Sequence, residues 1–199
     1  MTARTMSVPG NQQGYTLTAR VLHWLTAVIV IGLIPAGIYM VDAPAGPTQD
    51  LVFNLHRSFG FLLLLIVIVR LFYRLGHRPP PLPAEMPAFQ RDIAHTVHWT
   101  LYALLIAQPI IGWIGTSAYR APITVFWLFE LPPIWPVDRA FSESLFVVHR
   151  LLGFAIGGLA LLHIAAALHH HRRRRSRDGW DGPPCGPSAC PCRKDAPRA

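Results

Sequence analysis

The 199-residue sequence is poor in charged residues. Asp, Glu, Lys and Arg make up 14% of it, against about a quarter of a typical soluble domain. The net charge of +8 is concentrated at the end: residues 169–199 hold eight basic and three acidic side chains, residues 1–168 ten and seven. This distribution excludes a nucleic-acid-binding domain, whose basic residues would cover a folded face. The apolar body, with 52% hydrophobic residues overall, also excludes general disorder.

Cysteine is absent from the first 184 residues, so no disulfide stabilises the body of the chain. The three cysteines are Cys185, Cys190 and Cys192. Their spacing does not match the usual zinc-binding patterns. Their surroundings are rich in Pro, Gly and Arg, which favours a disordered basic tail over a soft-metal site.

Long apolar stretches dominate the body, at residues 17–41, 51–75, 93–118 and 145–168. Each is long enough to cross a hydrocarbon core of about 30 Å as a helix. The segments between them carry most of the prolines, which helix interiors exclude. We therefore predict an all-α membrane protein, an antiparallel four-transmembrane-helix bundle. Its parts are residues 1–16 as a cytoplasmic N-terminal segment, 17–168 as the membrane domain and 169–199 as the tail.

One apolar segment, residues 123–131, is too short to span and lies in a proline-containing connector. Its aromatic content predicts an interfacial segment or a lid.

The positions of Lys and Arg predict the orientation. With the N-terminus inside, fourteen basic residues fall on the inner side and four on the outer side. Both termini are then cytoplasmic, in a multi-pass membrane protein. A cleaved signal peptide is the weaker alternative, because the polar lead is long and residues 43–45 are a poor cleavage site.

Histidine is the polar residue of these spans. A single membrane histidine is as well explained by an interhelical hydrogen bond as by a function. Here six occur in two layers that avoid the bilayer centre, which favours a function. The outer layer holds His56 and His149, and the inner layer holds His23, His95, His98 and His163.

The last span links the two layers. His149 and His163 are 14 residues apart. In a helix this spacing is a rise of about 21 Å, and it places the two side chains on nearly the same face. One helix can therefore supply a ligand to each of two stacked centres. His56 is the other outer candidate, whereas the inner centre could take any of the three remaining histidines.

Two imidazoles without a carboxylate or cysteine favour a six-coordinate haem over a structural zinc site. Both outer histidines are followed one turn later by a glycine, Gly60 and Gly153, which would let a flat macrocycle approach the helix. The adjacent Arg57 and Arg150 are candidates to pair with haem propionates. Snorkelling to the membrane surface explains either arginine equally well.

An ordered set of motifs resembles the bacterial cytochrome b561 family, which is related to the cytochrome b subunits of nickel-iron hydrogenases. The matching residues are Arg20 to Trp24, His56 with Gly60, His98 to Tyr102 followed by Pro109 and Gly112, and His149 with Gly153 and His163. The resemblance covers roughly residues 13–172. It implies a four-helix protein of the bacterial inner (plasma) membrane, with two haem b groups stacked across the bilayer, that exchanges electrons with the quinone pool.

The resemblance also implies the iron ligands. The outer haem would take His56 and His149, and the inner haem His23 and His163. His95 lies one turn nearer the interface and is not expected to be a ligand. His98 would lie beside the inner haem or at a quinone site, and whether it replaces His23 as a ligand stays open.

The implied activity is one-electron transfer between a donor and ubiquinone or another quinone. Two histidine ligands leave no open iron position, so O₂ binding is not expected. The quinone could dock near His98 or Tyr102, or on the outer side near Phe126, Trp127 and Glu130, residues that could equally be interfacial anchors.

The partners expected are membrane lipid and a redox partner, with a second copy of the chain in a homodimer as a further candidate. A superoxide:quinone oxidoreductase and a cytochrome b subunit of a dehydrogenase or hydrogenase are both open. A non-redox transporter or assembly factor with structural histidines is the alternative from another class.

Overall fold

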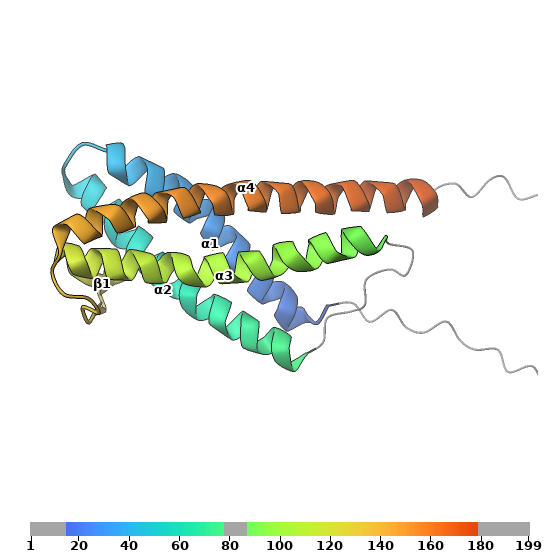
Figure 1. Cartoon of the computed structure of the whole chain (residues 1–199), viewed down its shortest axis with the longest axis horizontal. Helices are drawn as coiled ribbons and strands as arrows, with labels where there is room; N and C mark the ends of the chain where they lie inside the picture. Colours follow the sequence, from blue (N-terminus) through green and yellow to red (C-terminus); the bar gives the residue numbers. More distant parts are fainter. Residues whose placement is uncertain (1–14, 78–86, 179–199) are drawn as a thin grey trace, which may run out of the picture. The chain divides into compact units, whose positions relative to one another are not determined.

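Four long helices and one short hairpin make up the described chain. The computed structural model describes residues 15–77 and 87–178, with side chains up to His169. The elements, in chain order, are α1 (Leu17–Asp42), α2 (Pro47–Gly76), α3 (Ala88–Tyr119), β1 (Ile123–Val125), β2 (Phe129–Leu131) and α4 (Arg139–Asp178) (Figure 1). All four helices are long and apolar enough to cross a membrane, which confirms the all-α class and the four predicted spans. The tail cysteines and the prolines at 79–83 lie outside the described residues.

Each helix includes its predicted span and extends beyond it. The clearest extension is in α4, which begins at Arg139 rather than near residue 145 and continues to Asp178. Local sequence explains two other helix ends. Thr16 caps α1, because its Oγ1 accepts a hydrogen bond from the Ala19 backbone N–H at 3.3 Å. Pro47 begins α2 directly after Gly46, whose φ of 155° few other residues would adopt.

The chain divides into two units at Leu159, and each is described by itself. The described part of the first unit contains α1, α2, α3, the hairpin and residues 139–159 of α4. That of the second contains the remainder of α4, including His163.

The interior of the first unit is a small cluster of apolar side chains. It consists of Val30, Leu63, Val67, Tyr102, Leu105 and Ile156. Many large apolar side chains on the outside of the helices stay exposed, among them Trp24 at 65% and Phe72 at 69%. An apolar surface of this extent is suited to lipid, because hydrocarbon does not penalise it as water does.

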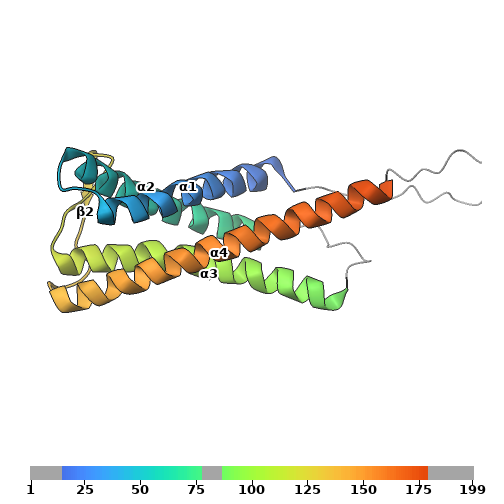
Figure 2. The ribbon, with the colours of Figure 1, turned by 90° about the horizontal axis from the view of Figure 1, so that it is seen from above.

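Residues 123–131, predicted as an interfacial segment or lid, form a two-stranded antiparallel hairpin. Ile123 pairs with Leu131 and Val125 with Phe129. The buried residues Ile123, Val125 and Leu131 pack against Phe61 of α2 and Trp113 of α3. Figures 1 and 2 show the hairpin at the same end of the first unit as the α1–α2 turn. We name this end, where α3 also ends and α4 begins, the hairpin end.

Candidate functional site

Two histidines from different helices meet near the hairpin end. His56 of α2 and His149 of α4 have ring centroids 6.1 Å apart, with their planes inclined by 68°. Both side chains are partly buried. The structure thus places together the two residues that the sequence assigned to one layer.

The orientation of His149 is set from α3. Its Nδ1 lies 3.1 Å from the backbone carbonyl of Gln108, so this nitrogen carries the proton and donates. The Gln108 side-chain amide in turn donates to the His149 carbonyl at 2.7 Å. With the proton held on Nδ1, the lone pair of Nε2 is free for a metal, which is the usual arrangement of a metal-binding histidine.

A glycine of the preceding helix lies against each of the two rings. A Cβ atom at Gly37 of α1 would lie 3.0 Å from Cε1 of His56. A Cβ atom at Gly112 of α3 would lie 3.1 Å from Cε1 of His149. Only glycine therefore lets the rings occupy these positions without displacement. The two helix pairs, α1–α2 and α3–α4, repeat the same contact.

The pair fits an iron held between two imidazoles. With a metal–nitrogen bond of about 2.0–2.1 Å, two rings on opposite sides of one metal have centroids about 6 Å apart, close to the 6.1 Å observed. In residues 15–77 and 87–169, no group of three or more His, Cys, Asp or Glu side chains could hold a metal ion. A metal at this pair would need further ligands from another molecule, as a porphyrin supplies them.

Comparison with known proteins identifies the family of the chain. Residues 14–178 match the family model described as prokaryotic cytochrome b561. The chain belongs to this family. A member of the cytochrome b561 family binds b-type haem and acts in electron transfer, so the chain is a multi-pass bacterial membrane cytochrome.

Three curated relatives extend over most of the chain. Cytochrome b561 homolog 2 of Escherichia coli (strain K12) is 32% identical over 165 residues, 82% of this chain and 87% of the relative. Probable superoxide oxidase CybB of Yersinia pestis is 29% identical over 151 residues, with coverages of 74% and 82%. Cytochrome b561 homolog 1 of Escherichia coli (strain K12) is 25% identical over 155 residues, with coverages of 77% and 88%.

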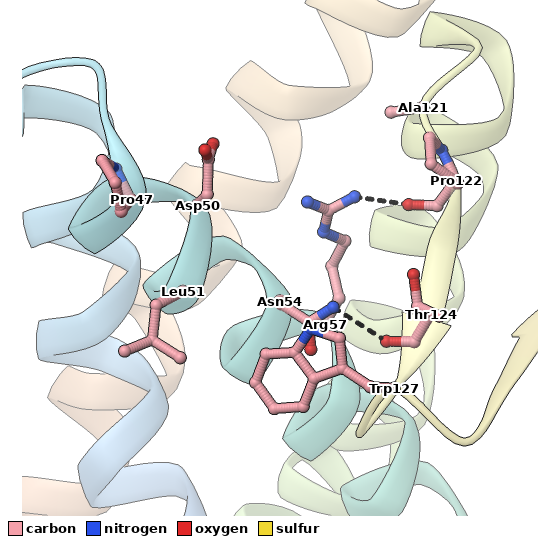
Figure 3. A pocket seen from close by; sticks show the side chains of 9 residues that line it. All are labelled: Pro47, Asp50, Leu51, Asn54, Arg57, Ala121, Pro122, Thr124 and Trp127. Carbon is pink, nitrogen blue, oxygen red and sulfur yellow. Dashed lines mark hydrogen bonds between the residues drawn. The ribbon is translucent and has the colours of Figure 1, made fainter.

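The arginine that follows His56 in this cytochrome b561 chain holds the hairpin. Arg57 donates from Nη1 to the Pro122 carbonyl at 2.6 Å and from Nε to the Phe53 carbonyl at 3.1 Å. Figure 3 shows the guanidinium reaching from α2 to the strand segment. Its role toward a propionate stays a prediction, as does that of the exposed Arg150.

A pocket of about 540 Å³ opens beside Arg57 (Figure 3). Its lining includes Asp50 and Asn54 of α2 and Trp127 from the hairpin turn. Trp127 and Phe126 both have positive φ, at 59° and 46°, a conformation that costs a non-glycine residue about 1–2 kcal/mol. The hairpin thus holds an exposed tryptophan at the edge of a pocket lined by both polar and apolar side chains.

His23 lies near the start of α1, and one of its ring nitrogens contacts an arginine. Arg70 of α2 donates from Nη2 to Nδ1 of His23 at 2.8 Å. Because a guanidinium only donates, Nδ1 of His23 is the acceptor here, unlike Nδ1 of His149. The His23 ring also meets Trp24 edge to face, at a centroid distance of 5.7 Å.

The other predicted site residues are placed as follows. His98 is partly buried one turn before the buried Tyr102 on α3, whereas His95 is exposed. His163 is partly buried in the second unit, so its pairing with His23 stays a prediction. A Cβ atom at Gly60 would meet nothing within 4 Å, and one at Gly153 would contact the Gln108 amide at 3.4 Å.

Sequence reasoning missed Gly37, Gln108 and the close packing role of Gly112. A spacing could have indicated the glycines. Gly37 lies 14 residues after His23, and Gly112 lies 14 residues after His98, and each of these histidines precedes a tryptophan. Gln108 left no such signal, because its role depends on contact with a helix 41 residues away in sequence.

Proposed function

We propose that the protein is a diheme b-type cytochrome that transfers single electrons across the bacterial inner membrane between a donor and the quinone pool. The observation that carries the proposal is the pair His56 and His149, at the spacing suited to one iron between two imidazoles. Membership of the cytochrome b561 family supports b-type haem as the group that brings the iron.

The second haem would take His23 and His163 as its ligands. His163 follows His149 by 14 residues within α4, and the family resemblance pairs it with His23. His98 remains the alternative to His23, because it occupies the equivalent place before Trp99 on α3.

Haem, when bound, supplies a one-electron redox couple. The chain's own residues hold and orient it. His56 and His149 would both hold the iron, and a haem held by two histidines is suited to electron transfer rather than to O₂ binding. Gln108 keeps the proton on Nδ1 of His149.

The orientation that we propose has both termini in the cytoplasm and the hairpin end outside. Fourteen basic residues then lie inside and four outside, in agreement with the positive-inside rule. Electron transfer across the whole membrane would work with or against the membrane potential, at about 2.3 kcal/mol per charge for each 100 mV.

The pocket beside Arg57 is the place that we propose for a reactant on the outer side. Nη2 of Arg57 makes no hydrogen bond to the described residues, so it can donate to an oxygen of a quinone or of superoxide. Trp127 offers an aromatic face to a quinone ring. Superoxide as donor is supported by the Yersinia pestis relative, whose name is probable superoxide oxidase CybB.

Purified protein tests the proposal. We expect two haem b per chain by the pyridine haemochrome assay, and anaerobic reduction of both by a quinol. Superoxide, generated enzymatically in the presence of quinone, should also reduce them. A colourless preparation would contradict the proposal and favour a non-redox membrane protein. Haem that responds only in the presence of a co-purified dehydrogenase would favour the subunit alternative.

A further inference from the structure

Two arginines of α2 share one aromatic ring of α3 inside the first unit. The Arg70 guanidinium carbon lies 5.3 Å from the centroid of the Tyr102 ring, and that of Arg74 lies 5.7 Å from the same centroid. Arg74 also lies 5.7 Å from the Trp99 ring. Tyr102 is 7% exposed, so two positive charges meet at a buried ring.

No acidic side chain among the described residues pairs with either arginine. Asp92, the acidic residue of α3 on this side, is exposed and lies about two turns before Trp99. Contacts with aromatic rings attract a cation without neutralising its charge. Two neighbouring cations in a membrane span therefore favour a ligand that brings negative charge.

The arginines also adjoin a proposed iron ligand, because Arg70 donates to Nδ1 of His23. A histidine that binds iron through Nε2 carries its proton on Nδ1. Arg70 cannot then donate to Nδ1, and its guanidinium needs another acceptor close by.

The spacing along the chain points to the same place. Arg70 follows His56 by 14 residues, as His163 follows His149. The position that carries a proposed iron ligand in α4 thus carries an arginine in α2. A guanidinium cannot ligate iron, but it binds carboxylates through two parallel hydrogen bonds.

We propose that Arg70 and Arg74 bind the two propionate carboxylates of the haem that His23 ligates. Haem b carries two carboxylates, which match the two guanidinium groups in number and in charge. This inference rests on the proposed function, since it requires a haem at His23.

The test uses the purified, haem-loaded protein with the substitutions R70Q and R74Q. Loss of a positive charge beside a propionate destabilises the reduced haem relative to the oxidised haem. We expect the midpoint potential of one haem to fall in each variant. A fall of about 59 mV corresponds to a tenfold change in the equilibrium between reduced and oxidised haem. The other haem should keep its potential. R70K should retain most of the wild-type value, because it keeps the charge.

R139Q is the matched control. The Arg139 guanidinium carbon lies 5.0 Å from the Tyr119 ring centroid at the hairpin end, so this substitution also removes an arginine–tyrosine contact. R139Q should leave the midpoint potentials of both haems unchanged. If R70Q does not accumulate in the membrane, R74Q and R70K provide the same comparison.

A second arm supplies haem dimethyl ester instead of haem during biosynthesis. The ester cannot form a carboxylate–guanidinium pair, so R70Q and R74Q should bind the ester as tightly as the wild type does, although they bind haem less tightly. An equal loss of affinity for haem and for the ester would contradict the proposal. So would unchanged potentials in both variants, or a loss of co-purified anionic phospholipid with both haems unaltered.

The haem content of the wild-type protein distinguishes a failure of the proposed diheme function from a failure of the proposed propionate binding. One haem per chain, retained in His23→Ala, would contradict the diheme function together with this inference. Two haems in the wild type, with potentials that R70Q and R74Q leave unchanged, would contradict this inference alone.

Discussion

The Cβ position of Gly112 lies 3.1 Å from Cε1 of His149, so α3 and α4 approach each other closely at the proposed iron ligand. A methyl group at this position has to displace the imidazole, and overpacking of this kind costs about 1–3 kcal/mol. We expect Gly112→Ala to lose or weaken one of two haems, measured as haem per chain and as a shifted midpoint potential. Gly32→Ala is the control, because a Cβ atom there meets nothing within 4 Å. Equal haem content in both variants would show that the contact does not matter.

His56 and His149 should behave as one unit. We expect His56→Ala and His149→Ala each to remove the same haem, and the double variant to remove no more than either alone. The reason is that an iron that would be held by two histidines is held by one alone after either substitution. The pyridine haemochrome assay and low-temperature spectra of the two haems measure this. His95→Ala, at an exposed position of α3, should keep both haems. Different haems lost in the two single variants would refute the pairing.

His23 and His98 can be separated by the same assay. We expect His23→Ala to lose the second haem, and His98→Ala to keep it with an altered potential. The family resemblance assigns the ligand role to His23, and His98 would lie nearby. The opposite result, with haem lost only in His98→Ala, would exchange the two roles and remove the basis for placing Arg70 at a haem.

Ser58 should stabilise the hairpin. Its side chain is fully buried, and its Oγ accepts a hydrogen bond from the Phe126 backbone N–H at 2.8 Å. Ser58→Ala leaves that N–H without its acceptor, at a cost of about 1–3 kcal/mol. We expect a lower thermal midpoint, followed by the absorbance of the bound haem. Ser144→Ala, which removes an exposed hydroxyl bonded within α4, should leave the midpoint within error.

Trp127 should affect reactant binding without affecting haem content. If a quinone ring packs on it, Trp127→Ala should raise the KM for quinol about fivefold, the effect of losing an aromatic contact of about 1 kcal/mol. Trp135→Ala is a suitable comparison, since Trp135 stacks on Phe141 and does not line the pocket. An unchanged KM in Trp127→Ala would place quinone binding elsewhere.

The hairpin shows where sequence reasoning fell short in the fold. Residues 123–131 were too short for a span, and their aromatic content and proline-containing surroundings predicted an interfacial segment or a lid. The pairing of Ile123 with Leu131 depends on the fold around it, because the buried face rests on Phe61 and Trp113 of two other helices. No local pattern in a three-residue strand carries that information.

The sequence by itself determined the four membrane helices and the order of the histidines along them. Both follow from local properties, since an apolar run of about 20 residues must be helical to satisfy its backbone in lipid. Only the tertiary structure decided that Gly37 and Gly112 make room for two imidazoles, and that Arg70 contacts His23 rather than merely marking the inner face. These contacts join residues 19 to 47 positions apart, and they arise from how closely two helices pack, which no single segment determines.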